Sequence, residues 1–362
     1  MSSSPPRLLV VDGTALAFRA FFAIIGLTDD QGRPSGALYG FITSLLRVIK
    51  SESADLVVIA WDRGEPTFRH LLCEDYKATR ERMDEDLAVQ LPWMREAVNL
   101  LGFSQLDRVG FEADDILASL AVQGSAAGYE VRLCASDKDL AQVVSENVRL
   151  CPPPKRNDPI AELGPLEVEE KFGVPPTQMA EWQALVGDSS DNVQGVPGVG
   201  PKKATILLKK YGSLAQVLER GPQEEKGKLR ENLEANIATA TLALELVTLK
   251  TDMDLGELAS FAPREYQQES LLSFCSDHSF NSLRERFVGS NEKDGSSGSA
   301  GAAVGSSSDN PFGDPGDRDY RLVDSPELLE QLRDGLSQSG GFAIDTETTG
   351  LDPLRCRLVG IS

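Results

Sequence analysis

Histidine and cysteine are scarce in this sequence, which limits the metal and redox chemistry that it can carry. The 362 residues include two histidines and five scattered cysteines, with no C-x-x-C pair. A zinc site needs clustered histidine and cysteine ligands, and a disulfide framework needs cysteines at paired spacings. The sequence argues against both and is typical of a reduced cytoplasmic protein.

Positive charge and long apolar stretches are also lacking. The formal net charge is −20 and the pI is about 4.6, which argues against a generally basic nucleic-acid coat protein but leaves room for a local basic patch. No apolar stretch approaches the roughly 20 residues that span a membrane, and the amino-terminal segment does not resemble a signal peptide. We therefore expect no membrane partner.

The first half of the chain alternates apolar stretches with helical patterns. Buried strands are predicted at residues 7–11, 55–61 and 130–135, and apolar side chains follow helical spacing over 38–49 and 87–101. This alternation predicts an α/β fold with a mostly parallel sheet.

From about residue 150 the pattern becomes all-helical. Residues 289–319 are rich in glycine, serine and aspartate, and they predict a disordered linker. We therefore divide the chain into an α/β region at 7–165, a helical region at 166–288, this linker, and the start of another folded region at 320–362. Helices of the second region are predicted over 165–173, 177–186, 201–211, 227–236 and 238–248.

Aspartates follow each of the three predicted strands. Because the carboxyl ends of parallel strands share one edge of a sheet, these acids are expected to meet in one cleft. Further acids come from the start of a predicted helix and from the helical half. The acids of this set are Asp12, Asp62, Glu112, Asp114, Asp115, Asp137, Asp139, Asp188 and Asp191.

The set predicts a metal centre. Most of the 56 acidic residues in the chain are simply solvated, and any single member of the set could be one of them. Solubility alone does not readily explain why an aspartate follows each of three buried strands. Carboxylates without histidine or cysteine suit Mg²⁺ or Mn²⁺, and two such ions about 4 Å apart activate water and stabilise the leaving oxygen of a phosphodiester. We expect two Mg²⁺ ions, with Mn²⁺ as a substitute.

A glycine-rich loop joins two predicted helices of the second half. Gly195 and Gly200 have the spacing of a nucleotide-binding P-loop, but proline stands where that motif needs lysine, so we reject this function. The pattern predicts a helix–hairpin–helix whose backbone N–H groups hold DNA phosphates without reading bases; a plain turn between helices is the alternative. The predicted DNA contacts are Gly195, Gly198, Gly200, Lys202 and Lys203.

A second basic element spans residues 67–83. A helix there would place Arg69, Tyr76 or Lys77, and Arg80 along one face. We predict that Tyr76 stacks on a base while the cations hold the phosphates of a single strand. A solvated charged helix is the alternative.

Together these motifs resemble the 5′ nuclease domains of bacterial DNA polymerases I, of the flap endonuclease superfamily. The resemblance covers about residues 7–290 and rests on LLVVDG, AWDRGEPTFRHLL, DYKATR, GFEADDILASLA, SDKDLAQVV and GDSSDNVQGVPGVGPKKA. It implies a PIN-like catalytic core with two Mg²⁺ ions, a helical arch over about 66–90, and a helix–hairpin–helix that grips duplex DNA.

The resemblance also implies roles for single residues. All the acids of the set correspond to metal-site positions, and Lys77 and Arg80 correspond to arch residues that steer phosphate. Gln194 and Asp84 depart from the family pattern, which typically has proline at both positions. The residues assigned to catalysis are Asp12, Asp62, Glu112, Asp114, Asp137, Lys77 and Arg80.

The implied activity is metal-dependent cleavage of DNA that carries 5′ flaps, nicks or RNA-primed 5′ ends. It belongs to repair and lagging-strand maturation, in a monomeric cytoplasmic protein at the nucleoid. Two alternatives stay open: a PIN-type ribonuclease, which the hairpin and arch disfavour, and a non-catalytic DNA-binding module, which the acid set disfavours.

The last residues resemble a second nuclease motif. The stretch FAIDTETTGLDP is similar to the first motif of a 3′–5′ exonuclease domain, in which Asp345 and Glu347 would be metal ligands. Two carboxylates from one segment do not hold two ions alone. We therefore expect the chain to be a fragment of a longer polymerase, with neither 3′–5′ exonuclease nor polymerase activity by itself.

Overall fold

The computed structural model describes residues 5–80, 82–153 and 161–289, and beyond these only residues 330, 333, 346–348 and 358–361. The predicted linker lies outside the described residues after its first position. The chain divides into two units, 1–296 and 297–362. In the second unit, β8 (Thr346–Thr348) and β9 (Leu358–Ile361) pair antiparallel. No helix in the described part of the chain is long and apolar enough to cross a membrane.

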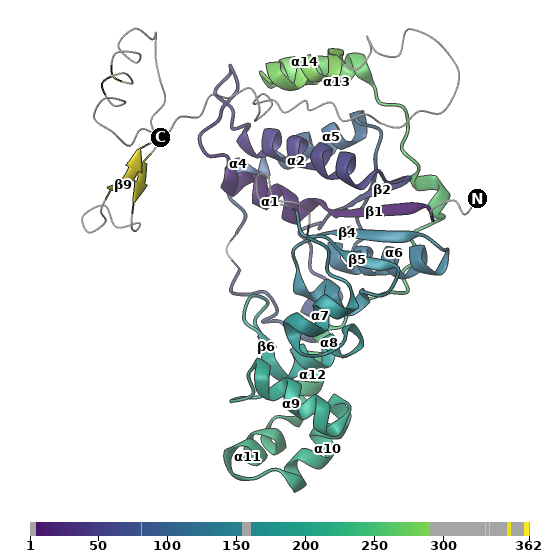
Figure 1. Cartoon of the computed structure of the whole chain (residues 1–362), viewed down its shortest axis with the longest axis vertical. Helices are drawn as coiled ribbons and strands as arrows, with labels where there is room; N and C mark the ends of the chain where they lie inside the picture. The colour runs from purple at the N-terminus through teal and green to yellow at the C-terminus, as the bar shows by residue number, and fades with distance from the viewer. Residues whose placement is uncertain are drawn as a thin grey trace. The chain divides into compact units, whose positions relative to one another are not determined.

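A five-stranded parallel sheet lies at the centre of the first unit (Figure 1). The strand order is β3-β2-β1-β4-β5, and each neighbouring pair is parallel. This topology confirms the predicted α/β fold. The strands are β1 (Arg7–Asp12), β2 (Leu56–Ala60), β3 (Ser104–Leu106), β4 (Glu130–Cys134) and β5 (Val148–Leu150).

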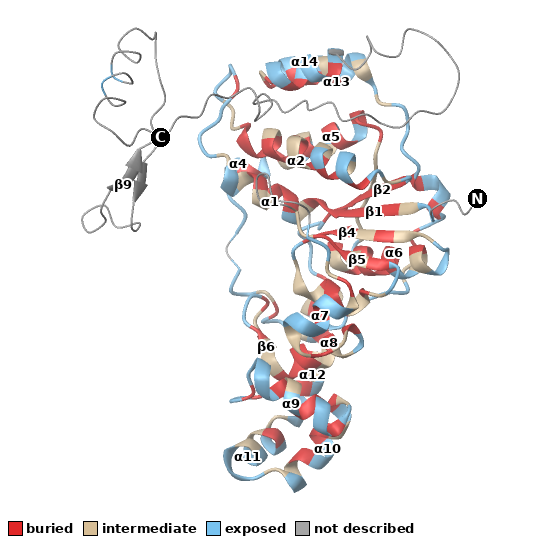
Figure 2. Cartoon of the chain, viewed as in Figure 1, coloured by how far each residue is buried: buried red, intermediate tan, exposed pale blue. Residues whose placement is uncertain are grey.

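Helices cover both faces of the sheet, because successive side chains of a strand point to opposite sides. Leu9 and Val11 of β1 belong to the core with α1, α2 and α5, whereas Leu8 and Val10 belong to the core with α6. The central strands are therefore buried on both sides (Figure 2). These helices are α1 (Gly13–Ala23), α2 (Gly36–Glu52), α5 (Leu91–Leu100) and α6 (Ala113–Ala126).

The second half is helical, as predicted, and its helices extend from the sheet in Figure 1. Helix α12 packs against α8, and α9 packs against α8 and α10. Two last helices, α13 and α14, return to the sheet half, where Leu271 and Leu283 join the core on the α2 side. The elements are η1 (Lys138–Val143), α7 (Pro165–Phe172), η2 (Pro176–Gln178), α8 (Met179–Val186), β6 (Gly187–Asp188), β7 (Val193–Gln194), α9 (Pro201–Tyr211), α10 (Leu214–Glu224), α11 (Gly227–Ala235), α12 (Ile237–Val247), η3 (Leu258–Phe261), α13 (Gln268–Asp277) and α14 (Asn281–Gly289).

The single helix predicted over 67–83 is wrong. Helix α3 (Phe68–Leu72) ends after five residues, and Lys77 adopts a left-handed conformation with φ of 56°, which interrupts any helix. Helix α4 (Glu85–Ala88) then begins at Asp84, whose side chain accepts a hydrogen bond from the backbone N–H of Asp86. The expected arch consists of two short helices joined by turns, so its basic residues do not share one helix face.

Candidate active site

The edge of the sheet where β1, β2 and β4 end gathers the predicted acids. Asp12 is the last residue of β1, and Asp62 and Asp137 follow β2 and β4. Because β1 lies between the other two strands, these residues meet at one edge. Asp62 and Asp137 are close enough to Asp12 for their negative charges to raise its pKa.

Helix N-termini hold two of these acids in place. Asp12 caps α1, where its side chain accepts a hydrogen bond of 2.8 Å from the backbone N–H of Ala15. Asp62 accepts one of 2.8 Å from the backbone N–H of Ala113, the first residue of α6. The exposed N–H groups at the start of a helix favour negative charge. Asp12 is thus fixed by the helix that follows it directly, and Asp62 by a helix that begins 51 residues further along the chain.

Three acids at this edge, one buried and two half-buried, lack a cation that balances them fully. Burial, with Asp62 and Asp137 nearby, raises the pKa of Asp12 to about 7, and burial, with Asp137, raises that of Asp139 to about 8. Burial and the surrounding acids also hold the pKa of Asp114 well above its ordinary value. One oxygen of Asp114, Oδ1, is buried and has no hydrogen-bond partner. Such a group takes up either a proton or a cation.

This donor set fits hard divalent cations. Carboxylate oxygens without histidine or cysteine suit Mg²⁺, and the partnerless oxygen of Asp114 is free to act as a ligand. Among the described residues, no three acids are already arranged around a common point as a metal site. The residues that would hold the ions are Asp12, Asp62, Asp114, Asp137 and Asp139.

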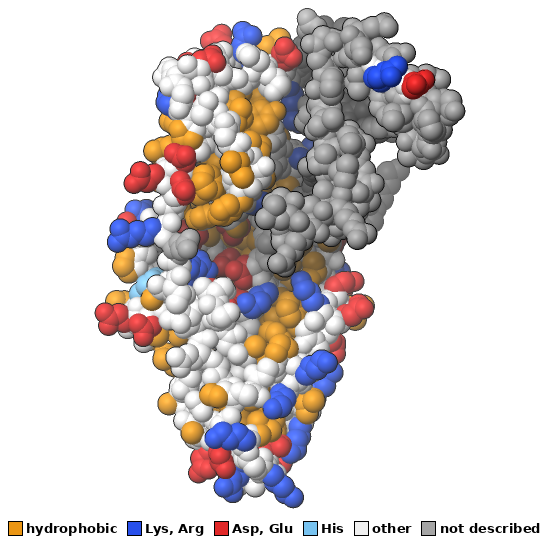
Figure 3. All heavy atoms as spheres, turned by 90° about the vertical axis from the view of Figure 1, so that its left-hand side faces the viewer, with side chains coloured by type: hydrophobic (Ala, Val, Ile, Leu, Met, Phe, Trp, Pro, Cys, Tyr) orange, Lys and Arg blue, Asp and Glu red, His pale blue; other side chains and the backbone are white. Residues whose placement is uncertain are grey.

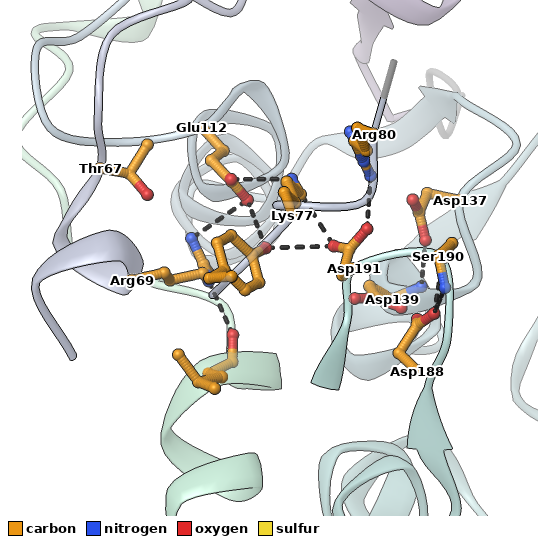
Figure 4. A network of polar contacts seen from close by, with 12 residues as sticks. Thr67, Arg69, Lys77, Arg80, Glu112, Asp137, Asp139, Asp188, Ser190 and Asp191 are labelled. Atoms are coloured by element: carbon orange, nitrogen blue, oxygen red, sulfur yellow. Dashed lines mark hydrogen bonds and ion pairs between the residues drawn. The ribbon is translucent and has the colours of Figure 1, made fainter. Parts of the chain in front are cut away.

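Cations of the chain itself balance a second set of acids (Figure 4). Glu112 accepts hydrogen bonds from Lys77 Nζ at 2.7 Å and from the Tyr76 hydroxyl at 3.1 Å. Asp191 pairs with Arg80 at 2.5 Å and contacts the same hydroxyl at 3.1 Å. Tyr76 thus connects an acid of the sheet half with an acid of the helical half. Its side chain is buried, so the prediction that it offers a stacking surface to a base is wrong for this structure.

Asp188 belongs to the same balanced set. It pairs with Lys138 at 2.5 Å and accepts a hydrogen bond of 2.9 Å from the backbone N–H of Ser190. Burial acts against the charged form, but these partners hold the pKa of Asp188 below its ordinary value. Sequence reasoning missed Lys138, although its position between two predicted acids was a usable signal, and it missed Gln183, which donates to Asp139.

Arg69 and Asp115 form a buried pair. The guanidinium donates two hydrogen bonds to the carboxylate, at 2.7 and 2.8 Å, and the two residues are 1% and 0% exposed. The predicted contact of Arg69 with DNA is therefore wrong for this structure. Both oxygens of Asp115 are engaged by Arg69, so we do not place Asp115 among the proposed metal ligands.

A cleft of about 860 Å³ is lined by one acid of each set. Asp62 and Glu112 line it together with Lys77 and Arg80. Figure 3 shows acidic and basic side chains next to each other near the middle of this face. The cleft thus brings carboxylates that suit metal ions close to cations that suit phosphate.

The glycine-rich loop connects α8 to α9 through the β6–β7 ribbon. A Cβ on Gly195 would lie 2.4 Å from a backbone nitrogen, and Gly198 has φ of 75°, so both positions require glycine. Gly200 precedes the first turn of α9, where Lys202 and Lys203 are exposed. A helix N-terminus beside two lysines has the chemistry that holds a phosphate.

The structure describes only a small part of the predicted 3′–5′ exonuclease motif. Asp345 lies outside the described residues, and Glu347 lies in β8 with its side chain outside them.

Two protein-family descriptions match this chain. The 5′–3′ exonuclease N-terminal resolvase-like domain matches residues 7–173, and the 5′–3′ exonuclease C-terminal SAM fold matches residues 174–269.

The curated relatives include DNA polymerases I. The thermostable enzyme of Thermus thermophilus is 41% identical over 281 residues, which are 78% of this chain and 33% of the relative. DNA polymerase I of Bacillus subtilis is 36% identical over 283 residues, which are 77% of this chain and 32% of the relative. The chain thus spans about a third of the length of these relatives.

Solved structures share the fold. The T5 D15 protein, co-crystallised with metal ions, aligns with a TM-score of 0.56 at 23% identity, over 78% of this chain and 98% of that one. The catalytic core of Rad2 in complex with a DNA substrate aligns with a TM-score of 0.55 at 16% identity, over 79% and 90%. These likenesses confirm the predicted PIN-like α/β core. The two family matches together cover most of the chain, which therefore belongs to the 5′–3′ exonuclease family of nucleases.

Proposed function

We propose that the chain hydrolyses DNA phosphodiesters at 5′ flaps and 5′ ends, with two Mg²⁺ ions held by the acids at the sheet edge. The observation that carries the proposal is the buried Asp114 oxygen without a hydrogen-bond partner, at an edge where burial and neighbouring acids also raise the pKa of Asp12 and Asp139. Mn²⁺ has the same ligand preference and is the expected substitute.

The ions and the chain would divide the work. When bound, two Mg²⁺ ions supply activation of water and stabilisation of the leaving oxygen. Lys77 and Arg80 line the same cleft as Asp62 and offer charged hydrogen bonds to phosphate oxygens. Both are engaged by Glu112 and Asp191 in this structure, so they become available to phosphate when these carboxylates turn to another partner.

The hairpin would hold the duplex beside the cleft. Its glycines let the backbone approach a phosphate closely, and Lys202 and Lys203 add charge at the N-terminus of α9. Contacts of this kind position DNA without reading its sequence. They support a nuclease that recognises the shape of its substrate.

Substrates with nicks, flaps and RNA-primed 5′ ends arise in repair and lagging-strand maturation, and we place the protein there. We also propose that it acts as a cytoplasmic, nucleoid-associated monomer. Sedimentation with and without flap DNA tests the monomer, because a dimer would double the mass of the free protein.

A cleavage assay tests the function directly. A flap DNA labelled at its 5′ end is incubated with Mg²⁺ or with EDTA, beside a blunt duplex and a single-stranded RNA. We expect a flap product only with Mg²⁺. Binding without cleavage would identify a non-catalytic module, and equal cleavage of the RNA would identify a ribonuclease.

A further inference from the structure

One guanidinium, that of Arg69, joins three separate segments in the interior of the protein. It lies in α3, donates twice to Asp115 on the first turn of α6, and donates to the backbone oxygens of Leu246 at 2.7 Å and Thr248 at 3.2 Å. The last two residues lie at the end of α12. Arg69 therefore ties the sheet half to the helical half (Figure 4).

Asp115 completes the junction from the other side. Its carboxylate also accepts hydrogen bonds from the backbone N–H of Glu112 at 3.1 Å and from that of Lys250 at 3.0 Å. The first of these contacts sets the start of α6, the turn that carries Glu112 and Asp114. Each polar group of the pair is thus used internally, and neither residue faces the cleft.

The junction also reaches the acids of the helical half. Helix α12 packs against α8, and α8 runs directly into β6, which contains Asp188. A shift of α12 relative to α6 would therefore change the distance between acids that come from different halves. A planar guanidinium resists such a shift, because its donors fit a carboxylate in only one geometry.

We propose that Arg69 and Asp115 are positioning residues that hold the first turn of α6, and with it Asp114, at the sheet edge where the metal ions would bind. They act through Glu112, Asp114 and α12, and touch neither ion nor DNA. The inference rests on the proposed function, since it assigns the pair a role in that metal site. Residues that orient ligands from behind commonly change metal affinity by roughly tenfold to a hundredfold when they are replaced.

The test measures Mg²⁺ binding by isothermal titration calorimetry without DNA, for the wild-type chain, Arg69→Ala and Asp115→Asn. We expect the Kd for Mg²⁺ to rise roughly tenfold or more in both variants, and free guanidinium to restore part of the loss in Arg69→Ala. Arg69→Lys keeps the positive charge but loses the two parallel hydrogen bonds to Asp115, and it should also bind Mg²⁺ more weakly. If Arg69→Ala does not fold, the Kd of Arg69→Lys serves as the test.

Two controls separate this role from others. Leu283 is a buried residue of α14, so Leu283→Ala lowers stability away from the junction and should leave the Kd for Mg²⁺ unchanged. A rise in Kd in Leu283→Ala as large as that in Arg69→Ala would overturn the inference. Binding of flap DNA in EDTA is measured against salt. If Arg69 held a phosphate, Arg69→Ala would reduce the salt slope by about one and leave Mg²⁺ affinity intact.

The proposed function and this inference fail in different ways. If the wild-type chain binds no Mg²⁺, the metal site is wrong and the positioning role is wrong with it. If the wild-type chain binds Mg²⁺ and all three variants bind it equally well, only the positioning role is wrong.

Discussion

The acids at the sheet edge and the acids near the hairpin differ in how their charge is balanced. Asp188 and Asp191 pair with Lys138 and Arg80, whereas Asp114 keeps an oxygen without a partner and its pKa is raised by burial and like charges. In the described part of the chain, Lys138 and Arg80 thus form ion pairs with acids of the second set, whereas the Asp114 oxygen has no partner. A bound metal ion would supply positive charge to that oxygen.

The largest expected effect comes from the unbalanced side. Asp114→Asn removes a charged oxygen from the centre of the acid cluster and should lower the single-turnover rate of flap cleavage at least about a thousandfold, since metal ions contribute several kcal/mol to such reactions. Thermal unfolding in EDTA should stay unchanged or move to higher temperature, because a repulsive charge has gone.

Two matched variants sharpen this test. Asp252→Asn makes the same chemical change at an exposed position and should alter neither measurement. Asp188→Asn leaves Lys138 without its partner and should lower metal-free stability. If Asp114→Asn cleaves at nearly the wild-type rate, the acids at the sheet edge do not hold the metal ions, and the contrast between the two sets of acids has no functional meaning.

A smaller effect is expected on the balanced side. Lys77→Ala combined with Arg80→Ala removes two cations from the cleft and should slow cleavage roughly a hundredfold, the usual cost of losing a hydrogen-bond donor that stabilises developing charge. The same change takes the Lys77 cation from Glu112 and the Arg80 cation from Asp191, so stability in EDTA should fall and Mg²⁺ should restore part of it.

Lys50→Ala, at the exposed end of α2, is the control for the double variant. Unfolding curves and single-turnover rates are recorded for both proteins. If the double variant is equally stable in EDTA and in Mg²⁺, the two cations do not balance the acids, and the asymmetry between the regions is not electrostatic.

The sequence predicted the sheet and its acids well, because both depend on local pattern. Strands buried on two faces read as apolar stretches such as LLVV, and each acid follows directly. By contrast, β3 and β5 have three residues each and carry little pattern. Helix α1 starts directly after β1, with Asp12 as its cap. Because no loop separates the two elements, the sequence pattern does not show where the helix begins.

The roles of the basic residues were harder to predict, because they depend on distant partners. Arg69 stands in a basic segment and looked exposed, yet its partners Asp115 and Leu246 are 46 and 177 residues away. Tyr76 likewise meets Asp191 across 115 residues. Local sequence shows that a side chain can bind phosphate, but burial by a remote helix decides whether it is available.

The hairpin should show a smaller effect still, on binding rather than on chemistry. Lys202→Ala combined with Lys203→Ala should weaken binding of flap DNA to a similar extent for every sequence, and should lower the slope of log affinity against log salt by about one per lysine. Lys209→Ala, at the far end of the same helix, should change the slope less. A loss that depends on base sequence would mean that the loop reads bases.

The last expected effect is on stability rather than on cleavage or DNA binding, and it is the pH dependence of the free energy of unfolding without metal. Folding raises the pKa of Asp12 to about 7 and that of Asp139 to about 8, chiefly by burial, while an unfolded aspartate titrates near about 4. The folded protein therefore binds these protons more tightly. Its free energy of unfolding in EDTA should fall as pH rises from about 4 to about 8, by at most about 1.4 kcal/mol per pH unit for each proton released.

Asp188 has the opposite sign, because folding lowers its pKa. Its contribution is fully present above the unfolded value and is lost only at lower pH, so it does not oppose the trend between pH 5 and 8. With saturating Mg²⁺ the slope should flatten, since the ions displace the protons from the same carboxylates. Urea unfolding at pH 5, 6, 7 and 8 measures both slopes. A profile in EDTA that is flat over this range, and equally flat in Asp12→Asn, would show that the sheet-edge acids are not the unbalanced region.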